Sequence, residues 1–309
     1  MVNQFRREMP RPIVGFGHSM GGSVMLDLAL MHPRLLTSVI AIEPTAGSNQ
    51  KGGSWPGVAS ITFRKDRWRS ADDAIDYFRK APIHKRWNSR VLELYRQYGL
   101  KHESPNTEVD APGSQTILKT SKHQEALNFA RASFPASPDH GLDTIEFDRE
   151  NHPEIVGVET DPKAPMYRPE STTIFKQLPS LRPSCFYIYG KDSTFSANLP
   201  WKRKEKMQVT GIGPGGSGGD PEGRVEEMDL PGSHFFPFEI PDELGQAVGV
   251  WLDAEMTKWR EAEAAHSDAW SAVPVEKRGA VSDEWVYWTK RLFKTPAKGA
   301  DGTAGKSKL

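Results

Sequence analysis

The segment 12–22, Pro-Ile-Val-Gly-Phe-Gly-His-Ser-Met-Gly-Gly, most constrains the fold, because it reads as a buried strand, a tight turn carrying a serine, and a helix start. Gly17 and Gly21 flank Ser19 in the pattern G-x-S-x-G. In a nucleophile elbow of this kind, the turn strains the serine backbone and leaves no room for neighbouring side chains. The serine Oγ then stands at a helix N-terminus, where developing negative charge is stabilised. The alternative is a chance glycine-rich turn.

The sequence around Ser19 favours the elbow. Residues 13–16 are apolar on both faces, as in a central parallel strand, and residues 24–31 continue as an apolar helix. A His-Pro-Arg run at 32–34 ends that helix, and residues 38–43 have the composition of the next strand. One complete βαβ unit therefore surrounds the serine.

Composition excludes several classes of protein. The 40 basic and 40 acidic residues give a formal net charge of +0, so no global field favours nucleic acid as a partner. The single cysteine, Cys185, excludes a disulfide framework and favours a reducing compartment. No apolar run approaches the ~18 residues of a membrane helix, so we expect no transmembrane segment. The motifs imply neither a metal nor a cofactor.

The chain divides into a core, an insertion and a tail. Strand-like segments at 12–17, 38–43, 184–190 and 224–230 predict an α/β core at 10–46 and 182–265 with a mostly parallel sheet. Residues 47–181 predict a helical lid over the serine, with a helix start at Ser70 and helices at 90–98 and 125–134. A helical extension at 266–296 and a disordered tail at 297–309 follow. Lid aromatics line an apolar pocket or form the lid's own core: Trp55, Phe63, Trp68, Trp87 and Phe129.

His234 is the candidate general base. It lies in a glycine-containing loop after the strand at 224–230 and before a helix beginning near Pro241. A serine nucleophile needs a base within hydrogen-bond reach, and the chain order serine, acid, histidine suits this elbow. The alternative is a solvated loop histidine.

Two carboxylates are candidates for the acid that orients His234. Glu43 ends the strand that follows the elbow helix, whereas Asp192 follows the strand at 184–190, one residue before Ser193. We favour Glu43, because an acid at a fixed strand end can hold the histidine tautomer. The alternatives are a structural carboxylate at Glu43 and a turn residue at Asp192.

Two further segments carry short signals. The chain ends in Ser307-Lys308-Leu309, the tripeptide that the peroxisomal import receptor reads, and the small polar residues before it would present it. The alternative is a frayed basic tail. The glycine-rich segment 211–219 precedes a strand and has no correctly placed lysine, so it predicts a flexible connection rather than a phosphate site.

The elbow at 17–22, the loop around His234 and the βαβ unit ending at Glu43 together resemble the α/β-hydrolase superfamily. The glycine-rich segment and terminal tripeptide make the chain similar to fungal peroxisomal α/β-hydrolases, including lipase-like proteins and hydrolases of toxin biosynthesis. The resemblance covers most of residues 10–265. It implies Ser19 as nucleophile, His234 as base and the Met20 N–H as an oxyanion donor.

The resemblance predicts a serine hydrolase that cleaves an ester or thioester of a mainly apolar acyl compound in the peroxisomal matrix. Candidate substrate contacts are His18, Trp55 and Phe235. The alternative from a different class is a non-catalytic interaction protein of the same fold, and one departure from the superfamily pattern raises it. Members of the superfamily carry about four strands before the elbow strand, and a loop there supplies the second oxyanion donor. Here only eleven residues precede Pro12, so we expect an incomplete version of a longer protein, with the elbow strand at an open edge.

Overall fold

The computed structural model describes residues 8–47, 56–103, 115–132, 166–194 and 200–293, together with the single positions 4, 5, 134, 139, 150 and 153. The predicted α/β architecture is confirmed. In the described residues, the main sheet has the order β1-β2-β8-β9, and every neighbouring pair is parallel. Its strands are β1 (Val14–His18), β2 (Ser38–Ile42), β8 (Ser184–Gly190) and β9 (Val225–Leu230).

The elbow strand β1 lies at the end of this order. It pairs with β2, and its Phe16 side chain is 50% exposed, so the two-sided burial that its apolar sequence predicts is absent within the described residues. By contrast, β2 and β8 are buried along their whole length. The predicted open edge at β1 is therefore present in the part of the chain that the structure describes.

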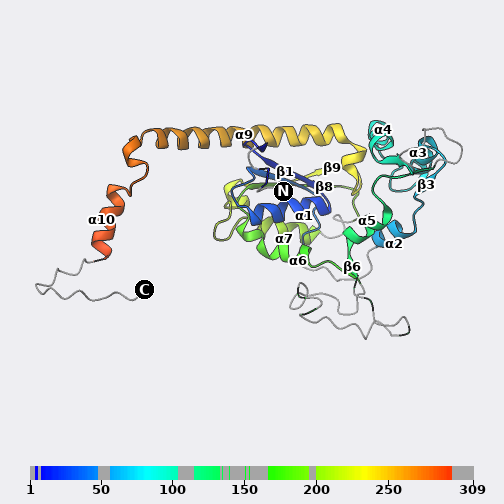
Figure 1. Cartoon of the computed structure of the whole chain (residues 1–309), viewed down its shortest axis with the longest axis horizontal. Coiled ribbons are helices and arrows are strands. Elements are labelled where there is room, and N and C mark those ends of the chain that lie inside the picture. The colour runs from blue at the N-terminus through cyan, green and yellow to red at the C-terminus, as the bar shows by residue number, and fades with distance from the viewer. Residues whose placement is uncertain are drawn as a thin grey trace, which may run out of the picture. The chain divides into compact units, whose positions relative to one another are not determined.

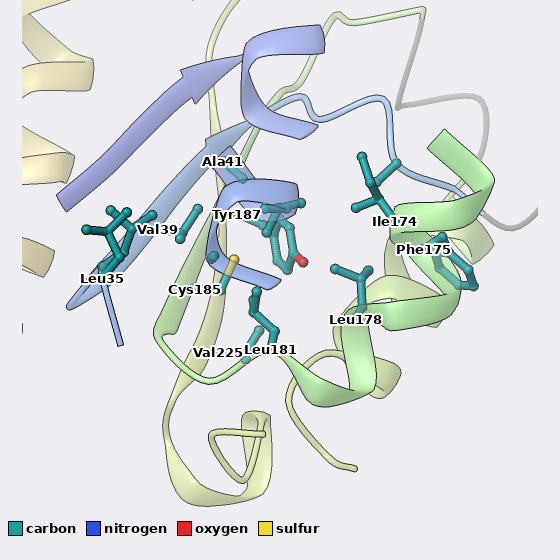
Figure 2. Close-up of a cluster of buried hydrophobic side chains, with 14 of the residues drawn as sticks. Leu35, Val39, Ala41, Ile174, Phe175, Leu178, Leu181, Cys185, Tyr187 and Val225 are labelled. Atoms are coloured by element: carbon teal, nitrogen blue, oxygen red, sulfur yellow. The ribbon is translucent and has the colours of Figure 1, made fainter. Parts of the chain in front are cut away.

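Helices cover both faces of the sheet (Figure 1). One face packs against α1 (Met20–Met31), α6 (Glu170–Gln177) and the 3₁₀ turn Leu178–Ser180, with Tyr187 and Cys185 of β8 beside Val39 and Ala41 of β2 (Figure 2). The other face packs Ile40, Ile42, Phe186 and Ile188 against α8 (Phe236–Glu239) and the first part of α9 (Pro241–Ser271). Alternate residues of the same strands thus supply two apolar cores.

The residues between β2 and β8, which include the predicted lid, form short elements. They are α2 (Pro56–Phe63), β3 (Arg67–Trp68), α3 (Ala71–Lys80), α4 (Ser89–Tyr98), β4 (Leu100–His102), β5 (Thr116–Leu118), α5 (Lys122–Phe129), β6 (Arg131–Ala132), β7 (Met166–Tyr167) and α6. Ser70 caps α3 as predicted, since its Oγ accepts the Asp73 N–H at 3.1 Å. Trp68 and Phe78 belong to a buried apolar cluster of this region. Of the two alternatives for Trp68, the structure therefore favours a place in the core of the predicted lid.

Two expectations for these connecting segments are wrong. The helix predicted at 125–134 ends at Phe129, because Arg131 and Ala132 pair as a strand with β7. The glycine-rich segment is held by hydrogen bonds rather than flexible. The Gly211 N–H donates to the Leu178 carbonyl at 2.8 Å, and the Gly213 N–H donates to the Pro179 carbonyl at 2.7 Å. A Cβ at Gly216 would lie 2.2 Å from the Gly211 oxygen, so glycine permits close backbone packing there.

The chain separates into two compact units, Met1–Met256 and Thr257–Leu309. Helix α7 (Pro200–Val209) lies in the first unit, between β8 and β9. The second unit contains the last part of α9, a 3₁₀ turn at Val275–Lys277 and α10 (Asp283–Leu292). The predicted boundary at 265 falls inside α9, and the tail 297–309 lies outside the described residues. None of the helices within the described ranges combines the length and the apolar composition that a membrane span requires.

Candidate active site

Ser19 occupies a strained turn between β1 and α1. Its φ of 55° and ψ of −119° lie outside the regions that non-glycine residues prefer, and its N–H donates to the Ile42 carbonyl at 2.8 Å. A Cβ at Gly17 would lie 2.2 Å from the Gly21 carbonyl oxygen, so that glycine is required. The expectation for Gly21 is wrong, because a Cβ there would meet nothing within 4 Å. The closely packed glycine is Gly22, where a Cβ would lie 3.0 Å from the Gly17 oxygen.

Three predicted residues meet at the carboxyl ends of the strands. His234 Nε2 lies 3.0 Å from Ser19 Oγ, and His234 Nδ1 lies 3.2 Å from Glu43 Oε2. A carboxylate only accepts hydrogen bonds, so Nδ1 carries the proton and Nε2 is left to accept one from the serine hydroxyl. This is the geometry needed to make a serine nucleophilic.

Glu43 is the better placed of the two candidate acids. Its side chain is fully buried, and its φ of 47° makes it the second strained residue of the site. Its Oε1 accepts the Gly190 N–H at 2.7 Å, and its Oε2 accepts the Ser193 hydroxyl at 3.0 Å. The side chain of Asp192 is instead 61% exposed and pairs with Arg86 at 3.2 Å.

The sequence did not reveal that Ser193 and Lys206 support this carboxylate. Ser193 follows β8, and its hydroxyl donates a hydrogen bond to Glu43, which follows the neighbouring strand β2. Lys206 of α7 is buried and donates from Nζ to the Pro44 carbonyl at 3.1 Å. Burial lowers its pKa to about 8. The negative charge of Glu43 opposes that shift, so the two buried groups attract each other.

His18, predicted as a substrate contact, forms a hydrogen bond with the backbone of His234. Its Nε2 donates to the His234 carbonyl at 2.8 Å, and the two rings lie 4.8 Å apart. Burial, and then the charge of His234, lowers the pKa of His18 to about 4, so the ring is neutral at pH 7. A neutral His18 holds the backbone of His234 without adding a positive charge beside it.

The remaining predicted residues fall into three groups. Met20 begins α1, so its N–H has no acceptor within the helix and lies next to the serine. The Phe235 ring is half-buried and lies 5.2 Å from the His234 ring. Trp55 and the tripeptide Ser307-Lys308-Leu309 lie outside the described residues.

The fold and the contacts among Ser19, His234 and Glu43 together indicate the class of protein. The chain belongs to the alpha/beta hydrolase family, because the sequence model of that family matches residues 2–247.

Particular relatives sharpen the comparison. The chain is 35% identical to the type I acyl-CoA thioesterase mpaH of Penicillium roqueforti, over 85% of this chain and 63% of that protein. It is 25% identical to the abhydrolase domain-containing protein ACTT2-1 of Alternaria alternata, over 90% of this chain and 97% of that one. Among solved structures, the peroxisomal alpha-beta-hydrolase Lpx1 of Saccharomyces cerevisiae matches with a TM-score of 0.55 at 14% identity, over 95% of this chain and 64% of that one. This last likeness concerns the fold alone. The chain spans less than two thirds of the length of the thioesterases it matches.

Proposed function

We propose that this protein is a serine hydrolase that cleaves an ester or thioester of a mainly apolar acyl compound. The observation that carries the proposal is the continuous contact from Ser19 through His234 to Glu43, at 3.0 and 3.2 Å. Chance placement of a serine, a histidine and a buried carboxylate at these distances, on a strained turn of this family, is improbable.

In the proposed reaction, Ser19 Oγ attacks the acyl carbonyl carbon while its proton passes to His234 Nε2. The Met20 N–H stabilises the oxyanion that forms, and Glu43 stabilises the imidazolium. When the tetrahedral intermediate collapses, Nε2 returns the proton to the departing alcohol or thiol and an acyl-enzyme remains. A water molecule then attacks the acyl carbonyl while its proton passes to His234 Nε2. The bond between the acyl group and Ser19 Oγ breaks, Nε2 returns the proton to Ser19, and the carboxylic acid is released.

Acyl thioesters of coenzyme A are the favoured substrates. Three of the relatives, each 34 or 35% identical to this chain, bear the name type I acyl-CoA thioesterase. The half-buried Phe235 ring beside His234 supports an apolar acyl group at the reacting carbonyl. The rival from a different class is a non-catalytic protein that retains the fold.

A fluorophosphonate probe separates the two, because labelling requires an activated serine. We expect the wild-type protein to be labelled and to hydrolyse acyl-CoA or p-nitrophenyl esters, and Ser19→Ala to lose labelling and at least about 10³-fold in activity. Ser89→Ala, at an exposed position in the first turn of α4, is the matched control and should retain both. Unchanged hydrolysis by Ser19→Ala would overturn the enzymatic proposal.

We also propose a peroxisomal location. Its support is the terminal Ser307-Lys308-Leu309, which has the form that the peroxisomal import receptor binds. Because the receptor reads a free C-terminal tripeptide, the address would act independently of the hydrolase fold.

A further inference from the structure

A short segment between α3 and α4 contacts the turn that follows the catalytic histidine. This strap, residues 86–88, makes three successive contacts with α8. Arg86 lies 3.3 Å from Glu239 Oε2, the Trp87 ring stacks on the Phe238 ring at 4.5 Å and 14°, and the Asn88 N–H bonds the Phe238 carbonyl at 2.8 Å. Three consecutive residues of the region between β2 and β8, called the inserted region below, are therefore fixed to one turn of the core.

Glu239 connects the strap to the loop that carries His234. Its side chain is only 4% exposed, and its Oε2 accepts the Ser233 N–H at 3.1 Å. Its Oε1 accepts the Ser233 hydroxyl, and the Ser233 Oγ in turn accepts the Phe235 N–H at 3.1 Å. The residues on both sides of His234 are thus tied, directly or through Ser233, to one carboxylate.

The loop backbone is shaped to receive that carboxylate. Gly232 has a φ of 116°, and a Cβ there would lie 2.7 Å from Glu239 Oε2. Gly190 is equally constrained, because a Cβ on it would lie 2.6 Å from the Ser233 carbonyl oxygen. A buried carboxylate also needs a compensating charge, and Arg86 supplies the guanidinium. Loop, carboxylate and strap therefore form one connected unit.

We propose that Glu239 and Arg86 are positioning residues for His234, so that the inserted region holds the catalytic histidine in register with Ser19. The inference rests on the proposed function. Neither residue touches the reacting atoms. Their effect passes through Ser233 to the position of the His234 ring, where a displacement of about 1 Å can cost about 10²-fold in rate. The network holds Phe235 only through its backbone N–H, so we expect its loss to affect catalysis more than substrate binding.

The test compares kcat and KM for an acyl thioester in the full-length protein. We expect Glu239→Gln to lower kcat by about 10- to 100-fold and to leave KM within about twofold, because alignment rather than binding is lost. Arg86→Gln should act in the same direction, and Arg86→Lys should recover most of the loss because it restores the charge. The double variant Arg86→Gln/Glu239→Gln should be no slower than Glu239→Gln alone, since the two residues act in series.

Arg96→Gln is the matched control. It removes an exposed ion pair with Asp72 within the same inserted region, at 2.9 Å, and should change neither constant. If Glu239→Gln does not fold, as judged by its melting transition, Arg86→Gln and Ser233→Ala decide the question. Folded variants with unchanged kcat, or a loss confined to KM, would overturn the inference. Wild-type turnover that does not depend on Ser19 would instead overturn the proposed function, and this inference with it.

Discussion

Replacement of Glu43 by glutamine tests the proposed site most severely. The substitution keeps the size of a fully buried side chain and changes one oxygen into an NH₂ group. In the native structure the carboxylate accepts from three donors: Gly190 N–H at 2.7 Å, Ser193 Oγ at 3.0 Å and His234 Nδ1 at 3.2 Å. A glutamine amide has one acceptor oxygen, so it cannot serve all three.

The preferred amide orientation predicts the size of the effect. If the oxygen faces His234, the NH₂ group opposes the Gly190 N–H, and that buried donor is left unpaired at a cost of about 1–3 kcal/mol. The amide therefore turns its oxygen to Gly190 and its NH₂ to His234 Nδ1. This places the imidazole proton on Nε2, which can then no longer accept the proton of Ser19. We expect kcat to fall by about 10⁴-fold, the loss typical of this tautomer reversal in serine enzymes and equivalent to about 5 kcal/mol.

The assay measures kcat with p-nitrophenyl and acyl-CoA substrates, beside a thermal melt that verifies folding. Asp192→Asn is the comparison variant, because it removes an exposed ion pair with Arg86 and leaves the Arg86 contact with Glu239 in place, so kcat should change by less than about threefold. A folded Glu43→Gln protein that retains more than about a tenth of wild-type kcat would refute the reasoning. A larger loss in Asp192→Asn would move the role of the acid to Asp192.

The remaining predictions concern single residues of the site, the pH dependence of stability and the cellular location. Ser193→Ala removes one donor to the buried Glu43 carboxylate, so it should lower kcat by about tenfold and the free energy of unfolding by about 1–3 kcal/mol, measured by kinetics and thermal melting. Gly17→Ala should abolish labelling of Ser19, since its Cβ would collide with the Gly21 backbone, whereas Gly21→Ala should be tolerated. Burial lowers the pKa of His84 from 6.5 to about 4, so the unfolded chain binds protons first. The contribution of neutral His84 to stability is therefore complete above pH 6.5 and is lost as the pH falls toward 4, and His84→Gln should flatten the pH dependence of the melting temperature in this range. A fluorescent protein fused at the N-terminus should mark peroxisomes, and deletion of Ser307–Leu309 should make it diffuse.

Features that depend on local chemistry could be predicted from the sequence. The glycines around Ser19, the apolar runs at the strands and the cap at Ser70 act over a few residues, so their pattern predicted the elbow, the parallel sheet and the start of α3. Chain order alone placed the histidine loop after the strand now seen as β9.

Contacts between residues far apart in the chain depend on how the whole fold packs. The end of α5 depends on pairing between β6 and β7, and the glycine-rich segment is fixed by carbonyls of residues 178–181, so neither outcome is visible locally. Both candidate acids follow strand ends. The register of β2 on β8, with Ile42 opposite Ile188, brings Glu43 to the Gly190 N–H and turns Ser193 toward it. The contact between Arg86 and Glu239 likewise joins residues far apart in the chain and could not be predicted from the local sequence. Such choices depend on the summed packing of many side chains, which no single motif encodes.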